Sequence, residues 1–259
     1  MLLPLLAALA LTPPVGTRQR AIVVVGANQS FNWAGYVQGV LEKGTTFHSI
    51  AAEWNVPAVT QHRPGEAEYS STWIGIGGGC VNADCSIPDP TLIQAGVGHD
   101  IDAAGNARYY TWWETIPAPS VDAGLAVGPG ERVRVEITEG LPGVWTITIQ
   151  NLTRTTSVEL TLPYTSTTAT AEWVLETPFV VDDSGHVSVG PLPDVSDVRF
   201  DLATTNGTNA DLIRSEEMQL LDFYGSGIIA LPSRPDKEAD GFDICAYADK
   251  CKKPGPGFR

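Results

Sequence analysis

Apolar and polar side chains alternate with a period of two along most of this 259-residue chain. The alternation is clearest in RVRVEIT (132–138) and VWTITIQ (144–150), which a turn containing Gly and Pro joins. Because successive side chains of a strand point to opposite faces, this pattern indicates strands with one buried face. Similar stretches cover residues 46–56, 70–77, 91–97, 108–116, 157–163, 169–177, 197–203, 216–222, 226–231 and 241–248. Many short strands separated by Gly- and Pro-containing turns predict an all-β fold, a two-sheet antiparallel β-sandwich or jelly roll.

One stretch departs from this pattern. ADLIRSEEMQLLDFYG, from Ala210, is the one candidate helix of the chain, but its apolar spacing fits either period. We interpret the end of this stretch as a strand that leads into a hairpin turn at residues 225–227.

The length fits a single sandwich domain, since such folds run to roughly 200–250 residues. We expect residues 1–16, MLLPLLAALALTPPVG, to be a signal-like segment that directs export, because this apolar run is too short to span a membrane. Residues 17–30 are then a linker or a short pro-segment, in which AIVVV (21–25) adds a strand. The sandwich domain covers residues 31–250, and residues 251–259 form a tail.

The charge balance is 16 basic against 30 acidic residues, a net charge of −14. Such an excess of negative charge argues against nucleic acid or an anionic membrane as a partner. It suits an acidic environment, where carboxylates become protonated and their mutual repulsion weakens. Solubility alone is the simpler explanation of the same charge.

The four cysteines form two pairs that are close in sequence, Cys80 with Cys85 and Cys245 with Cys251. In an exported chain this arrangement favours two local disulfides. A single zinc site with four thiolates is the alternative, but the spacings C-x4-C and C-x5-C are looser than those of usual zinc knuckles. The sequence therefore predicts disulfides and no metal.

Alternation also assigns side chains to a second, non-core face of several strands. The core face would carry Ile74, Ile76, Ile93, Ala95, Val97, Ala171, Trp173 and Leu175. The opposite face would carry Trp73, Gly75, Gly77, Gln94, Gly96, Tyr110, Trp112, Glu114, Glu172, Val174 and Glu176. Aromatic, glycine, carboxylate and carboxamide groups together are typical of the floor of a groove, because a solvated face would carry more Thr, Ser and Lys.

Common catalytic motifs are missing. The four histidines are scattered, and there is neither an HExxH nor a G-x-S-x-G sequence. The DSG at 183–185 matches one loop of an aspartic dyad, which needs two such loops, so a polar turn is the better interpretation. GIGGGC at 75–80 lacks the third glycine and the helix of a dinucleotide-binding loop.

Seven short segments occur in the order typical of one known family: NWAGYV (32–37), WNVP (54–57), STWIGIGG (71–78), TLIQAGV (91–97), YYTWWETIP (109–117), NLT (151–153) and AEWVLE (171–176). With these segments the chain resembles the glutamic peptidases of the eqolisin family, which were first described from fungi. The likeness covers residues 32–176 and weakens beyond them.

The resemblance implies a sandwich of two antiparallel sheets similar to concanavalin-like lectins. It also implies a secreted acid endopeptidase that acts on polypeptides as a monomer and needs no cofactor. By motif, the catalytic dyad falls on Gln94 and Glu176, and Trp73, Trp112 and Glu114 would line the cleft and hold the substrate. Gly77 and Tyr110 stand where the family usually has acidic residues, so the surroundings of the dyad differ.

Two other functions fit the same features. A glycoside hydrolase on this fold would use Glu114 and Glu176 as its carboxylate pair, about 5 to 5.5 Å apart in a retaining enzyme. A carbohydrate- or peptide-binding sandwich without catalysis would use Trp73 and Trp112 as a stacking platform. The glycosidase alternative leaves Gln94 without a role.

Overall fold

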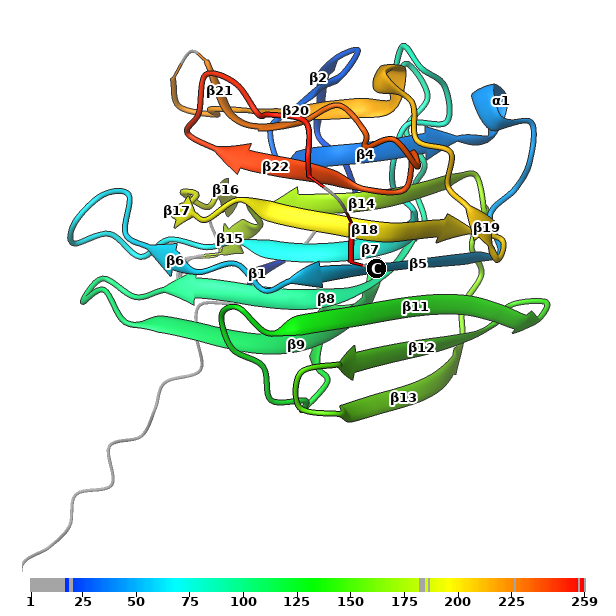
Figure 1. Cartoon of the computed structure of the whole chain (residues 1–259), viewed down its shortest axis with the longest axis horizontal. Helices are drawn as coiled ribbons and strands as arrows, with labels where there is room; N and C mark the ends of the chain where they lie inside the picture. The colour runs from blue at the N-terminus through cyan, green and yellow to red at the C-terminus, as the bar shows by residue number, and fades with distance from the viewer. Residues whose placement is uncertain are drawn as a thin grey trace, which may run out of the picture.

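The chain folds into two antiparallel β-sheets packed face to face (Figure 1). This computed structural model describes residues 17–18, 21–181, 185, 187–225, 227–255 and 257–258. The expected signal-like segment, residues 1–16, lies outside the described residues. The architecture confirms the predicted all-β sandwich.

The first sheet, called here the groove sheet, contains seven strands. Their order across the sheet is β20 (Glu217–Leu221), β4 (Trp33–Gly39), β14 (Thr170–Glu176), β7 (Ser71–Gly77), β8 (Leu92–Ile101), β9 (Ala107–Thr115) and β10 (Val121–Asp122).

The second sheet, called here the outer sheet, covers one face of the groove sheet. Its order is β13 (Thr156–Pro163), β12 (Val144–Asn151), β11 (Arg132–Leu141), β5 (Ser49–Asn55), β18 (Val198–Thr205), β22 (Phe242–Ala246) and β21 (Ile228–Pro232). β21 pairs with β20, which also pairs with β4, so β20 joins both sheets at one edge.

Short elements complete the structure. β15 (Phe179–Val181) pairs with β16 (Val187–Val189) and β1 (Thr17–Arg18). The remaining elements are β2 (Val24–Gly26), β3 (Gln29–Ser30), β6 (Val59–Thr60), β17 (Asp194–Val195), β19 (Thr208–Asn209), the helix α1 (Val40–Lys43) and the 3-10 helix η1 (Arg214–Glu216).

The candidate helix from Ala210 does not form. Only the three residues of η1 are helical there, and β20 follows directly. Met218 and Leu220 are buried while Gln219 between them is partly exposed, so the period of two decides this segment. The predicted hairpin is confirmed, because β20 pairs with β21 across the turn.

The main core lies between the two sheets, and the predicted core face is confirmed. All eight residues assigned to that face are buried in this cluster: Ile74, Ile76, Ile93, Ala95, Val97, Ala171, Trp173 and Leu175. The outer sheet supplies the facing side chains, among them Trp145 and Phe200. The faces of β7, β8 and β14 are thereby fixed, because a slip of one residue would turn every side chain over.

Both predicted disulfides are present, Cys80–Cys85 and Cys245–Cys251. The alternative of a zinc site is wrong, since all four thiols are used in these bonds. In the tail, the backbone N–H of Phe258 donates to Asp201, and the Arg132 guanidinium lies 4.4 Å from the centre of the Phe258 ring. No helix among the described residues has the length and apolar character needed to cross a membrane.

Candidate active site

A second apolar cluster lies on the face of the groove sheet that points away from the outer sheet. We call this surface the groove face. Its buried members include Trp33, Val37, Trp73, Leu92, Trp112 and Val174. The predicted second face is thus confirmed for Trp73, Trp112 and Val174. Trp33 and Val37 were not singled out from sequence, although their spacing of four along β4 would have placed both on one face.

Strand register arranges the polar residues of the groove face in two rows. One row runs Glu172, Gly75, Gln94 and Glu114 across β14, β7, β8 and β9. The other runs Glu176, Ser71, Gly98 and Tyr110 across the same strands. Trp73 and Trp112 lie between the two rows, level with Gly96.

The register also separates Gln94 from Glu176. Their strands are two spacings apart, about 10 Å, and their rows are four residues apart, about 13 Å. The Cα atoms are therefore roughly 16 Å apart on a flat sheet. Curvature of the sheet and the lengths of the two side chains reduce the gap between their polar ends.

Two hydrogen bonds hold these side chains. Gln94 Nε2 donates to Glu114 Oε2 over 2.8 Å, and Trp73 Nε1 donates to Glu176 Oε2 over 2.8 Å. The indole of Trp73 also packs edge-on against that of Trp33, with ring centres 4.9 Å apart. The structure therefore brings four of the five predicted site residues into two hydrogen-bonded pairs. Trp112, the fifth, lies beside them over Gly96.

Glycines make this close packing feasible. A Cβ at Gly96 would lie 2.1 Å from the Thr72 carbonyl oxygen and 2.5 Å from Cβ of Trp73. Gly77 has a φ of +92°, and a Cβ there would lie 2.2 Å from the Thr91 carbonyl oxygen. A side chain at position 77 would therefore be strained in this chain, and the acidic residue that the resemblance implies there is absent.

Tyr110, the other departure, occupies space that Gly98 leaves. A Cβ at Gly98 would lie 2.2 Å from the Tyr110 ring. The Tyr110 hydroxyl donates to Asp100 Oδ2 over 3.0 Å, and the Arg108 guanidinium lies 4.9 Å from the ring centre. Tyr110 thus brings a second acidic group, Asp100, to the same end of the groove face as Glu176.

Burial raises the pKa of several carboxyl groups of this face. Burial raises the pKa of Glu114 to about 8, and the bond from Gln94 offsets only part of the effect. Burial, with a contribution from the Asp89 carboxylate, raises the pKa of Glu172 well above its usual value. Burial also raises the pKa of Asp100 to about 6. The site is therefore less negative at acid pH than its composition implies.

These shifts predict how stability depends on pH. A carboxyl with a raised folded-state pKa stabilises the fold below its unfolded pKa, and the effect is lost as pH rises through its folded pKa. For Glu114 this window runs from 4.5 to about 8. We expect the melting temperature, measured by circular dichroism, to fall as pH rises from 6.5 to about 8, because the opposite effect of His99, whose pKa burial lowers from 6.5 to about 3, is complete below this range.

Two matched variants test whether the titration of Glu114 causes the fall in melting temperature. Glu114→Gln should flatten the fall, because the new side chain does not titrate, whereas the exposed Glu159→Gln should leave it unchanged. Carboxyls with lowered pKa values, such as that of Glu139, lose their contribution only at lower pH and do not act in this window. A melting temperature that rises between pH 6.5 and about 8 would contradict the prediction.

Several buried polar atoms of the groove face have no hydrogen-bond partner among the described residues. They are Nε1 of Trp33, Nε1 of Trp112 and Oε1 of Gln94. Unpaired buried groups are rare and costly in folded proteins. These three atoms therefore keep hydrogen-bonding capacity on the groove face.

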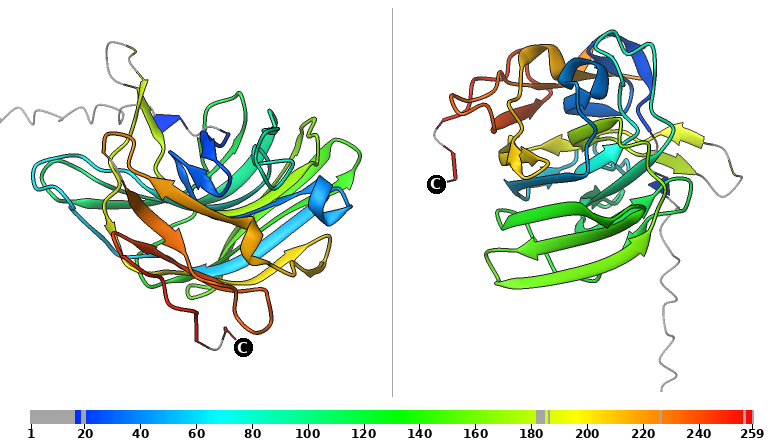
Figure 2. Two further views of the ribbon diagram at one scale, coloured as in Figure 1. Left: turned by 90° about the horizontal axis from the view of Figure 1, so that it is seen from above. Right: turned by 90° about the vertical axis from the view of Figure 1, so that its right-hand side faces the viewer.

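The groove face is covered in this structure. Gln94, Glu176 and Trp73 are fully buried. Ile22 belongs to the same apolar cluster as Trp73, and Val24 packs against it. The left view of Figure 2 shows the N-terminal strands, in blue, on the concave side of the curved sheet.

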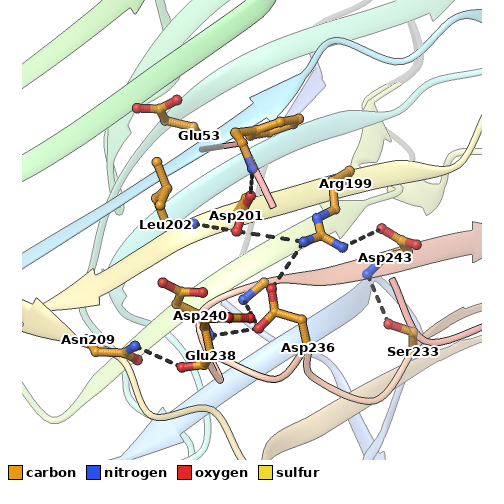
Figure 3. A network of polar contacts seen from close by, with 12 residues as sticks. Glu53, Arg199, Asp201, Leu202, Asn209, Ser233, Asp236, Glu238, Asp240 and Asp243 are labelled. Atoms are coloured by element: carbon orange, nitrogen blue, oxygen red, sulfur yellow. Dashed lines mark hydrogen bonds and ion pairs between the residues drawn. The ribbon is translucent and has the colours of Figure 1, made fainter. Parts of the chain in front are cut away.

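One acidic group elsewhere has the spacing of a metal site. Carboxylate oxygens of Asp201, Asp236 and Asp240 lie within 4.8 Å of one another. Arg199, however, already supplies a cation: its guanidinium lies 3.1 Å from Asp236 Oδ2 and 3.7 Å from Asp201 Oδ1 (Figure 3). These residues link β18, the segment after β21 and the C-terminal tail, so the cluster forms a structural ion-pair network apart from the groove face.

Comparison with known proteins agrees with the fold. The model of the peptidase A4 family matches residues 31–230. A crystal structure of scytalido-glutamic peptidase with a transition state analogue inhibitor has a TM-score of 0.60 and 19% identity, covering 83% of this chain and 98% of that chain. Aspergilloglutamic peptidase from Aspergillus niger has a TM-score of 0.51 and 21% identity, covering 70% of this chain and 99% of that chain.

At these identities the two solved structures show a shared fold. A search of curated proteins gives no match. The family match is independent of both results and spans well over half of the sequence, including every residue of the two rows. The resemblance to glutamic peptidases is thereby confirmed, and the chain belongs to the peptidase A4 family.

Proposed function

We propose that this peptidase is a secreted acid endopeptidase that hydrolyses peptide bonds with Gln94 and Glu176. The observation that supports the proposal best is the pair of bonds that hold these two side chains on one buried face. Trp73 Nε1 fixes one oxygen of Glu176, and Glu114 fixes one N–H of Gln94. The other N–H and the carboxamide oxygen of Gln94 are left for substrate and water.

The chemistry follows from these groups. Glu176 holds a water, accepts its proton during attack on the peptide carbonyl, and passes that proton to the leaving amine. Gln94 orients the water through its C=O and donates an N–H to the oxyanion, because a carboxamide offers both functions. The unpaired indole N–H of Trp112 lies beside this point and can hold a substrate carbonyl. Glu114, protonated at acid pH, keeps the carboxamide in one orientation.

The glycosidase alternative fits the register less well. Glu114 and Glu176 lie on strands three spacings apart, about 14 Å, and in rows four residues apart. A retaining pair needs its carboxyl groups about 5 to 5.5 Å apart, so these two side chains have a wider gap to close than those of Gln94 and Glu176. This alternative also leaves the Gln94 carboxamide without a catalytic role.

The N-terminal residues fit a regulatory part in this function. We propose that residues 1–16 direct export and that residues 17–30 are a short pro-segment. Ile22 and Val24 lie on the groove face, so a polypeptide reaches Gln94 and Glu176 only after this segment has moved. In support, the residues matched by the family begin at 31, after the segment.

Digestion assays separate the three functions. We expect the acid-treated chain to cleave an unfolded polypeptide at acid pH, with activity falling toward neutrality as buried carboxyls beside the dyad, such as that of Asp100 with its pKa raised to about 6, lose their protons. A β-glucan should stay intact, and chelators and serine-directed reagents should not inhibit. Polysaccharide cleavage, or loss of proteolysis on adding a chelator, would contradict the proposal.

A further inference from the structure

The backbone around Ile22 is held from both sides by groups of the body of the protein. Ile22 N–H donates to the Gly78 carbonyl over 2.9 Å. Val23 N–H donates to Asn32 Oδ1 over 2.8 Å, and Asn32 Nδ2 donates to the Ala21 carbonyl over 3.4 Å. We call the Asn32 carboxamide and the Gly78 carbonyl the clamp. The clamp forms these hydrogen bonds only with main-chain atoms of the three consecutive residues 21–23.

The side chain of Ile22 enters the groove face. It is 7% exposed and belongs to the apolar cluster that contains Trp33, Trp73 and Trp112. The indoles give this position a large apolar surface. The pattern is that of a bound peptide strand, in which main-chain bonds give affinity and a pocket for the side chain gives selectivity.

The clamp is itself built into the fold. Asn32 is fully buried, and its Oδ1 also accepts a bond of 2.9 Å from the Ser30 hydroxyl. Its backbone carbonyl accepts the N–H of Thr177, the residue after Glu176. Gly78 directly follows β7, the strand that carries Trp73. The clamp therefore has a fixed position relative to both Glu176 and Trp73.

The clamp lies inside the part of the chain that the family model matches, and the three residues bound to the clamp lie outside it. Asn32 and Gly78 lie inside the matched residues 31–230, whereas Ala21, Ile22 and Val23 lie before them. A peptide-binding arrangement thus belongs to the shared domain, while the peptide that fills it belongs to the segment that precedes the domain.

We propose that the clamp is a substrate subsite for an extended peptide with an aliphatic, β-branched side chain, and that residues 21–23 occupy it as an internal ligand. The proposal rests on the proposed function, because it takes the groove to bind polypeptides. Backbone recognition by Asn32 and Gly78 accepts any sequence, and the indole surface selects the side chain. An acidic or amide side chain would lose its water there without a hydrogen-bond partner.

Peptide binding to the full chain tests the proposal. The probe is the acetylated and amidated tetrapeptide AIVV, the sequence of residues 21–24, and all proteins carry Glu176→Gln so that nothing is cleaved. Ile22→Asp should release the internal ligand, because an unpaired carboxylate in the apolar cluster is costly. Val25→Asp is the matched control, since Val25 lies in the same segment with 43% of its side chain exposed.

Calorimetry and tryptophan fluorescence should rank the peptide affinities of the protein variants in the same order. AIVV should bind the Ile22→Asp protein at least tenfold more tightly than it binds the Val25→Asp protein or the chain with an intact segment, where the internal ligand competes. ADVV, with Asp in place of Ile, should bind none of them. Adding Asn32→Asp to the Ile22→Asp protein should weaken AIVV about tenfold, because the donor to the peptide carbonyl is lost.

Equal affinity of AIVV for all three proteins, or equal binding of ADVV, would overturn the proposal. If Ile22→Asp unfolds the chain, Ile22→Ala, which only removes contacts, should show the same ranking with a smaller difference. Selective AIVV binding together with an inactive protein that retains Glu176 would refute the proposed function and leave the subsite standing. Proteolysis without selective AIVV binding would refute the subsite alone.

Discussion

Replacing Glu176 with Gln should reduce peptide hydrolysis by about four orders of magnitude. General acid–base catalysis by one group contributes roughly 10²–10⁴ in rate, and we assign both the base and the acid step to this carboxyl. A glutamine keeps the shape and can still accept the bond from Trp73 Nε1, so the fold should be unchanged. The measurement is kcat on a peptide substrate, after the same acid treatment as the parent chain.

Glu159→Gln is the control for this variant. Glu159 is an exposed glutamate on β13 of the outer sheet, so its replacement changes the net charge equally without touching the groove face. It should keep full activity. A Glu176→Gln protein that turns over substrate within tenfold of the parent rate would remove Glu176 from the mechanism.

Gln94→Ala should slow the reaction by roughly 10²–10³, which corresponds to about 2.7–4 kcal/mol for the loss of one oxyanion donor. The oxyanion exists only in the transition state, so kcat should fall and KM should stay nearly constant. The variant also frees Glu114 from its bond to Nε2. Steady-state kinetics with one chromogenic peptide separates the two constants.

The control for this change is Gln150→Ala on β12, where the side chain lies on the outer sheet and points away from the core. It should behave like the parent chain. If Gln94→Ala raises KM and leaves kcat unchanged, Gln94 stabilises the bound substrate and the transition state equally and is not an oxyanion donor. If both constants are normal, Gln94 serves only to pair with Glu114.

The faces of the strands could be predicted from sequence because they depend on local alternation. Trp73 and Gln94 lie opposite Ile74 and Ile93, and both assignments follow from a period of two. The family resemblance then singled out Gln94 and Glu176 among the polar residues of that face.

Contacts between strands could not be predicted in the same way. The bond from Trp73 to Glu176 joins residues 103 positions apart, and it depends on the register of β7 against β14. Register is set by the packing of the whole core, which no short window of sequence contains. The same reason hid the role of Asn32, since its partners Ala21 and Val23 meet it only through the folded backbone.

The position of β20 between the two sheets has a consequence for biosynthesis. Glu217 and Met218 complete the edge of β4, a strand formed by residues 33–39 near the start of the domain. As the ribosome releases the chain, this edge stays open until more than 180 further residues have emerged. Pairing over such a separation is slow, and an open strand edge invites association with other chains. Until β20 has emerged, the open edge of β4 is therefore the part of the groove sheet at which the nascent protein can associate with other chains.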